Sequence, residues 1–111
     1  MQKKAHDLKI YISESVTRKL KEKHKVAKYE LFQCFRNRTG KFAYDVRERH
    51  QTNPPTLWFI SETNAGRRLK LVFLRYDKTE FVIKSAFEPN AEEERIYRYA
   101  QRGQKNEQEE T

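Results

Sequence analysis

Alternation of apolar and polar side chains over residues 55–90 constrains this fold more than any other part of the chain. The stretch contains three runs rich in β-branched and aromatic residues, TLWFISE, RLKLVFLRY and EFVIKSAFE. A period of two is typical of strands with one buried face, and the polar tripeptide at residues 77–79 is typical of a hairpin loop. We therefore predict three antiparallel strands joined by two tight loops.

A three-residue loop at 77–79 pairs Tyr76 with Glu80 and so sets the register of the second hairpin. In this register one face of the sheet is apolar and forms the predicted core: Leu57, Phe59, Leu69, Leu71, Phe73, Ile83 and Phe87. A slip of one residue would mix the two faces, and a sheet with one buried face selects against such a slip.

The other face is expected to be polar at one end, with Trp58 between its two ends. The same register brings four charged side chains together there: Arg68, Lys70, Lys84 and Glu88. Three cations and one carboxylate on a half-buried face suit a phosphate group and supply an acid or base. The alternative is a solvated face, on which an Arg68–Glu88 cross-strand pair contributes under ~1 kcal/mol.

Helical patterns flank this meander on both sides. A short alternating strand is expected at 8–12, helices at about 14–24, 28–37 and 91–102, and a short strand or an extended pass at 41–46. Ser13 suits the start of the first helix and Gly40 the end of the second. Asn90 followed by Glu93 is a capping-box pattern for the third.

These elements predict an α+β fold with a four-stranded, mainly antiparallel sheet, an N-terminal helical hairpin on one face and a C-terminal helix. A chain of 111 residues accommodates one hydrophobic core. We expect residues 1–102 to form a single domain and the polar residues 103–111 to be a disordered tail.

Net charge is the strongest indication of a partner. The chain carries +8 at pH 7 with a pI of about 9.7, which favours a polyanion, nucleic acid first and an acidic protein second, over charge that serves solubility alone. The first predicted helix is especially basic, and its cations could solvate the helix or face phosphate or a protein partner: Arg18, Lys19, Lys21 and Lys23.

The sequence lacks the residues that several kinds of site and targeting segment need. The lone Cys34 forms no disulfide framework and is expected to be a buried structural thiol, which fits a reducing cytoplasm. The sequence has no zinc-type Cys/His spacing, Asp-rich cluster, signal peptide or long apolar run, so we expect no metal, no cofactor and no membrane. RNA supplies its own 2′-hydroxyl nucleophile, so a base, an acid and cations suffice for metal-free cleavage.

Five further residues are expected to contact nucleic acid: Arg67, Trp58, His50, Tyr97 and Arg98. Tyr97 and Arg98 belong to the last predicted helix and should point over the polar sheet face. His50 lies in a polar loop between cations, where it could act as an acid or base or be an exposed bystander.

The order strand, helix, helix, three-stranded meander, helix, together with four motifs, resembles the BrnT-type toxins of the RelE-like ribonuclease fold. The motifs are Lys23-His24, the stripe from Glu30 to Phe35, GRRLKLVF at 66–73 and EERIY at 93–97. BrnT-like chains usually have glycine where this chain has Lys25, and an arginine where it has Phe87.

The resemblance implies a cytoplasmic toxin of a type II toxin–antitoxin pair that cleaves RNA, including ribosome-bound mRNA, without metal and is neutralised by an antitoxin protein. Together with the charged end of the sheet face, it leads to the hypothesis that Arg68 and Lys70 hold the scissile phosphate and that Lys84 or Glu88 acts as the base. The acid would be Tyr97, Arg98 or His50.

Two other functions fit the same residues, namely a non-catalytic RNA- or DNA-binding module and a protein-interaction domain whose basic helix meets an acidic partner. The chain is also similar to small bacterial proteins labelled ADP-ribosyl-(dinitrogen reductase) hydrolase. That chemistry would need a magnesium-binding carboxylate set, which the sequence lacks.

Overall fold

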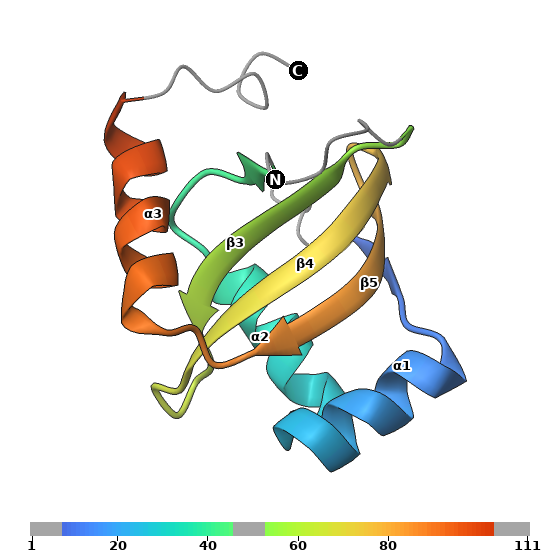
Figure 1. The fold of residues 1–111 in the computed structure, drawn as a ribbon. Helices are drawn as coiled ribbons and strands as arrows, with labels where there is room; N and C mark the ends of the chain where they lie inside the picture. The colour runs from blue at the N-terminus through green and yellow to red at the C-terminus, as the bar shows by residue number, and fades with distance from the viewer. Residues whose placement is uncertain (1–7, 46–52, 104–111) are drawn as a thin grey trace.

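A computed structural model describes residues 8–45 and 53–103 of the chain. A five-stranded sheet with the order β1-β5-β4-β3-β2 lies at its centre (Figure 1). Its strands are β1 (Lys9–Tyr11), β2 (Ala43–Tyr44), β3 (Thr56–Glu62), β4 (Arg68–Asp77) and β5 (Glu80–Phe87). The helices are α1 (Glu14–Lys19), the π-helical turn η2 (Leu20–His24), α2 (Lys28–Asn37) and α3 (Ala91–Gly103).

The α+β class and the three-stranded meander are confirmed, but the prediction of four strands was wrong. β1 pairs in parallel with β5, which places Ile10 beside Phe81, so the sheet is mixed. β2 pairs with β3 through Ala43 and Tyr44 alone, which resolves the choice left open for residues 41–46. The strand expected at 8–12 is thus confirmed as β1, whereas β2 was left open because two residues are too few to show a period.

The predicted helical hairpin is also only partly correct. α1 runs directly into η2 beside β5, and α2 packs against β3, so the helices contact the sheet more than each other. Lys25 ends η2 in a left-handed conformation, with φ 56° and ψ 43°. The buried side chains of both helices, Leu20, Leu31, Cys34 and Phe35, are directed at the sheet, and this burial determines how the helices lie.

A cluster of five phenylalanines fills the space between α2 and the sheet. Their ring centroids lie 4.9–5.9 Å apart, and many of the pairs meet edge to face, an arrangement that aromatic rings favour: Phe35, Phe42, Phe59, Phe73 and Phe81. Cys34 is buried beside this cluster, and burial raises the pKa of its thiol to about 12. The expectation of a structural thiol agrees with this environment.

A β-bulge at Lys84 changes the predicted register. Phe73 pairs with Ile83 as expected, but Val72 pairs with Ser85, so Lys84 is an extra residue in β5. From Ser85 onward, each side chain of β5 points to the face of the sheet opposite to the predicted one. Ala86 enters the core, whereas Phe87 turns to the opposite face beside Lys70. The predicted core position of Phe87 and the predicted register of β5 beyond Ile83, including the Arg68–Glu88 pair, were therefore wrong.

The turn between β4 and β5 is shorter than predicted. Asp77 pairs with Glu80 across a two-residue turn, and Asp77 Oδ1 accepts a hydrogen bond of 2.8 Å from the Thr79 amide. Tyr76 is an extra residue on β4 and compensates for the shorter turn. The next pairs therefore keep the predicted register, because burial of the apolar face selects it.

α3 begins at the predicted capping box. The Asn90 side chain accepts from the Glu93 amide at 2.7 Å, and Glu93 Oε1 accepts from the Asn90 amide at 3.0 Å. The helix packs against β3 and β2 (Figure 1). The Tyr97 ring lies 5.4 Å from that of Trp58. Gly103 is the last residue of α3, so most of the predicted tail lies outside the described residues. In the described part of the chain, no helix has the length and hydropathy to cross a bilayer.

Candidate nucleic-acid interface

Three cations meet where β4 begins, and we call them the sheet-end cluster: Arg67, Arg68 and Lys70. Sequence analysis placed all three in a phosphate-binding or nucleic-acid-binding surface. In the structure each of them forms an ion pair with at least one glutamate. The cluster is therefore largely neutralised from within the molecule.

Arg67 joins four separate parts of the chain. Its Nη2 and Nη1 donate to the carbonyl oxygens of His24 and Lys25 at 3.1 and 2.8 Å, which satisfies the end of η2. Nη1 also donates to Glu30 at 3.0 Å, and Nε donates to Glu88 at 2.8 Å. Burial opposes the charge of Arg67, but the hydrogen bonds to Glu88 and Glu30 outweigh it, and the pKa of the guanidinium is raised. Arg67 thus holds the fold together and has little donor capacity left for a ligand.

Arg68 forms a bidentate ion pair with Glu94 of α3. Its Nε and Nη2 donate to the two carboxylate oxygens of Glu94 at 2.7 and 2.8 Å, and Nη1 lies 3.3 Å from Glu62. The hydrogen bond from Arg68 lowers the pKa of Glu94, and the same bond raises the pKa of Arg68. Both groups are charged at neutral pH and bind each other.

Lys70 is only 4 % exposed and cannot reach a phosphate in this arrangement. Its ammonium lies 3.2 Å from Glu93, 4.3 Å from the centre of the Trp58 ring and 5.7 Å from that of Phe87. A cation over an aromatic face is stabilised by the negative charge of that face. Trp58 is buried between Lys70 and Tyr97, and its ring is not available as a stacking surface.

The other predicted site residues are dispersed. Lys84 is exposed at the bulge, and Glu88 follows the end of β5 and binds Arg67 instead of Arg68. Tyr97 is buried, its hydroxyl donates to the Lys41 carbonyl at 3.0 Å, and burial raises its pKa. Arg98 is exposed on α3. His50 lies outside the described residues.

An open groove of about 680 Å³ runs between the end of α2, the edge of β3 and α3. Arg68, Tyr97 and Arg98 line it together with amide and hydroxyl side chains: Asn37, Thr39, Ser61, Thr63, Asn64 and Gln101. Many of these groups already bind one another or the backbone. Asn37 donates to the Glu62 carbonyl and to Asn64 at 2.9 Å each, and Gln101 accepts from the Lys41 amide at 2.7 Å. The bond from Asn37 satisfies the Glu62 carbonyl at the end of β3, beyond the part of this strand that pairs with β2.

A second group of cations has different surroundings. We call it the basic helix surface, and it comprises the exposed cations from α1 to the start of α2: Arg18, Lys19, Lys21, Lys23, Lys25 and Lys28. Within residues 8–45 and 53–103, none of these side chains forms an ion pair. The segment contains two acidic residues, Glu14 and Glu22, so its net charge is positive.

Two exposed aromatic rings lie next to the basic helix surface. Tyr29 is 63 % exposed and Phe32 is 41 % exposed, whereas Leu31 and Phe35 of the same helix are buried. Residues three apart on a helix are neighbours, so the two rings form one aromatic patch. Cations beside exposed rings are typical of surfaces that bind single-stranded nucleic acid.

Sequence analysis missed the partners of the sheet-end cluster. Glu93 was assigned to the capping box and Glu94 to the EERIY motif, yet they also bind Lys70 and Arg68. Sequence alone gave no signal for this second role, because the pairs join residues more than 20 positions apart. The stripe from Glu30 to Phe35 was treated as core, although Phe32 is exposed.

The residues that the structure describes contain no group of three or more His, Cys, Asp or Glu side chains that could hold a metal ion. Comparisons of the chain with protein-family models, with curated proteins and with solved structures gave no match.

Proposed function

We propose that this protein binds single-stranded RNA through the basic helix surface and the aromatic patch beside it. The observation that supports the proposal is that the two groups of cations differ in their ion pairs. Ion pairs occupy the cations of the sheet-end cluster, whereas those of the basic helix surface have no carboxylate partner among the described residues. Unpaired lysines and arginines can replace the counterions of a phosphate backbone, and the release of those counterions drives association.

The aromatic patch supports a single-stranded ligand over a duplex. Tyr29 and Phe32 are exposed rings, and unpaired bases can stack on such rings at about 1–3 kcal/mol per base. In a duplex the bases are already stacked, and a side-chain ring has little access to them. RNA is also the substrate of the toxins that the sequence resembles.

The proposal is tested by neutralising two cations in each of two places. Lys19→Gln/Lys23→Gln removes charge from the basic helix surface. Lys9→Gln/Lys78→Gln removes the same charge from exposed positions on β1 and the β4–β5 turn. We expect the first pair to weaken binding of a fluorescent RNA oligonucleotide roughly tenfold and to lower the slope of log affinity against log salt by about 1.4.

The control pair should have a much smaller effect, because it leaves the interface intact. Equal weakening by both pairs would show that only net charge matters and would sink the proposal. A DNA oligonucleotide of the same sequence and a Tyr29→Ser/Phe32→Ser variant test the preference for RNA and the stacking in the same assay.

A metal-independent ribonuclease toxin with a RelE-like fold is our second candidate. Two features support it. The order strand, helix, helix, three-stranded meander, helix resembles that of BrnT-type toxins, with the short β2 added, and Lys25 has φ 56° at the position where those proteins usually have glycine. Glycine adopts this conformation at little cost, so the position fits the motif although the residue differs.

Cleavage by the expected residues would require a change in the sheet-end cluster. Arg68 and Lys70 can bind a scissile phosphate only when Glu94 and Glu93 release them. Lys84 and Glu88 are the candidates for the base, and both are exposed. This candidate function therefore needs a rearrangement of α3, whereas RNA binding through the basic helix surface does not.

Expression in a bacterial host tests the second candidate. The wild type is induced beside Lys84→Ala/Glu88→Ala, and growth and total mRNA are followed. Growth arrest with loss of mRNA, relieved in the double variant, would support the toxin. Intact mRNA during wild-type expression, together with intact RNA in a purified assay with chelator, would exclude it and leave RNA binding in place.

A further inference from the structure

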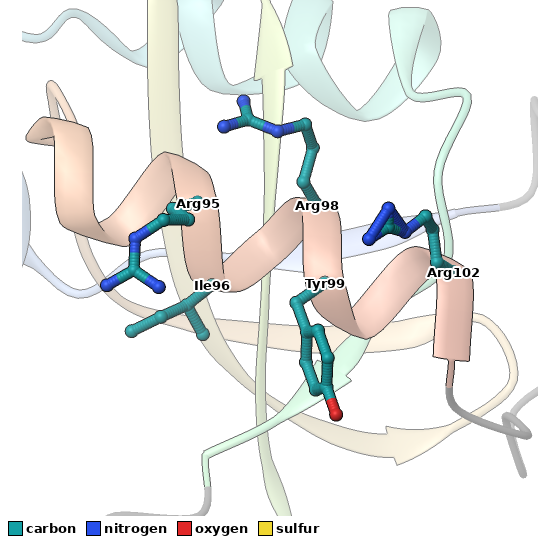
Figure 2. A pocket seen from close by; sticks show the side chains of 5 residues that line it. All are labelled: Arg95, Ile96, Arg98, Tyr99 and Arg102. Atoms are coloured by element: carbon teal, nitrogen blue, oxygen red, sulfur yellow. The ribbon is translucent and has the colours of Figure 1, made fainter.

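The outward side of α3 exposes large apolar side chains, although the other side of this helix is already packed against the sheet. Three arginines and two large apolar side chains line a shallow hollow of about 220 Å³ there (Figure 2). We call it the α3 outer face: Arg95, Ile96, Arg98, Tyr99 and Arg102. Tyr99 is 71 % exposed and Ile96 is 44 % exposed, whereas Tyr97 on the inner side is buried.

The five side chains form two rows along the helix. Ile96 and Tyr99 are three residues apart and project to the same side (Figure 2). Arg95, Arg98 and Arg102 follow at intervals of three and four and form the second row, in which Arg98 points away from the apolar pair (Figure 2). Arg95 binds Glu92 at 2.5 Å, and within the described part of the chain Arg98 and Arg102 have no ion pair. The surface therefore combines positive charge, part of it unpaired, with an adjacent apolar row.

A partner that binds the α3 outer face must supply both negative charge and an apolar side chain. Residues 104–111 are acidic but contain no apolar residue, so the chain's own C-terminal segment could not cover Ile96 and Tyr99. A second copy docked through the same face would place arginines opposite arginines, because a two-fold contact is self-complementary. RNA could bind the cations and stack on Tyr99, but Ile96 offers no planar face for a base.

We propose that the α3 outer face binds an acidic amphipathic segment of another protein, with an apolar residue that packs between Ile96 and Tyr99. The first and last arginines are seven residues apart, or about 10 Å along the helix. A helical partner would meet them with carboxylates two turns apart and an apolar side chain between them. Helices commonly present such anchors to a partner at intervals of three and four residues.

This inference does not depend on the RNA-binding proposal, since it concerns different residues on a different element. The basic helix surface lies on α1, η2 and the start of α2, whereas the proposed docking face lies entirely on α3. Each interface can therefore be removed without altering the other.

A synthetic probe tests the proposal. A fluorescent helical peptide of about 16 residues carries leucines at intervals of three and four, flanked by glutamates, and a second peptide of equal charge has serine in place of leucine. We expect the leucine peptide to bind the full-length protein and the serine peptide to bind at least about fivefold more weakly. Amide chemical shifts should change along residues 95–103.

Variants of the protein locate the contact. Ile96→Ser/Tyr99→Ser and Arg95→Gln/Arg102→Gln should each weaken binding of the leucine peptide about tenfold. Tyr76→Ser removes another exposed tyrosine, from β4, and should leave binding unchanged, as should Lys19→Gln/Lys23→Gln. Thermal unfolding of each variant, followed by circular dichroism, confirms that the fold is retained.

Three outcomes would overturn the proposal. Equal affinity for the leucine and serine peptides would reduce the contact to non-specific charge. Shift changes outside α3 would place it elsewhere. Loss of RNA binding, but not of peptide binding, in the α3 variants would assign this face to nucleic acid.

Discussion

The sheet-end cluster and the basic helix surface contain the same kinds of residue and differ in what packs around them. In the first, Arg67, Arg68 and Lys70 are held by glutamates that come from α2, β3, α3 and the segment after β5. In the second, the cations project into solvent from a helix with few acidic residues. The first group therefore contributes to the fold, and the second is available to a polyanion.

The difference shows that a cation's role depends on its neighbours more than on its place in a motif. GRRLKLVF contains the most concentrated cations of the meander, and sequence analysis took them for a phosphate-binding surface. The acidic first turn of α3 lies over two of them in the folded chain. Four predictions test the contrast, in order of decreasing effect on the free energy of unfolding.

The largest effect is expected at Arg67. Arg67→Ala should lower the free energy of unfolding by about 3 kcal/mol, because it leaves the mostly buried Glu30 unpaired and removes the donors at the end of η2. Arg67→Lys should recover less than half of this loss, since an ammonium cannot reproduce the fork of donors. Urea unfolding measures the change, with Arg98→Ala as a control that should cost less than about 0.5 kcal/mol. A loss at Arg67 no larger than at Arg98 would contradict the contrast.

The Arg68–Glu94 pair should make stability depend on pH. The hydrogen bond from Arg68 lowers the pKa of Glu94 from its ordinary value of 4.5. As the pH falls, Glu94 is therefore protonated in the unfolded chain before it is protonated in the folded one. The contribution of the pair to the free energy of unfolding is complete above pH 4.5 and is lost as the pH falls through the folded-state pKa of Glu94. Glu94→Gln should cost about 1 kcal/mol at neutral pH, with a smaller loss under acid. Parallel pH profiles of the wild type and the variant would contradict this role.

Lys25 offers a stabilising substitution. Its left-handed conformation costs a residue with a Cβ atom about 1 kcal/mol, which glycine avoids. Lys25→Gly should raise the free energy of unfolding by up to about 1 kcal/mol, although it removes the hydrogen bond from Lys25 Nζ to the Glu22 carbonyl. Lys25→Ala removes the same bond and keeps the strain, so it should show no gain in urea unfolding. A gain for alanine equal to that for glycine would point away from backbone strain.

The smallest effect on stability is expected on the basic helix surface itself. Lys21→Gln/Lys23→Gln should change the free energy of unfolding by less than about 0.5 kcal/mol, since both side chains are exposed without an ion pair in the described structure. The same variant should weaken RNA binding. A loss of stability comparable to that of Arg67→Ala would mean that the two regions do not differ in the way proposed.

Sequence patterns predicted the parts of the fold that depend on nearby residues. The capping box at Asn90, the Ser13 cap, the meander and most of its buried face follow from alternation and capping, which operate within a few positions. The α+β class followed from the order of these patterns. The strand expected at 8–12 was confirmed as β1, but its parallel pairing with β5 was not predicted, and β2 was left open because two residues are too few to show a period.

The amino-acid sequence by itself determined the apolar face of the sheet, the helix ends and the large positive charge. Only the tertiary structure decided which cations remain unpaired. The bulge at Lys84 turned Phe87 away from the core, and folding brought Glu93 and Glu94 onto Lys70 and Arg68. The physical reason is range: apolar periodicity and caps act between neighbours along the chain, whereas an ion pair depends on distances of a few ångströms that only the folded chain sets.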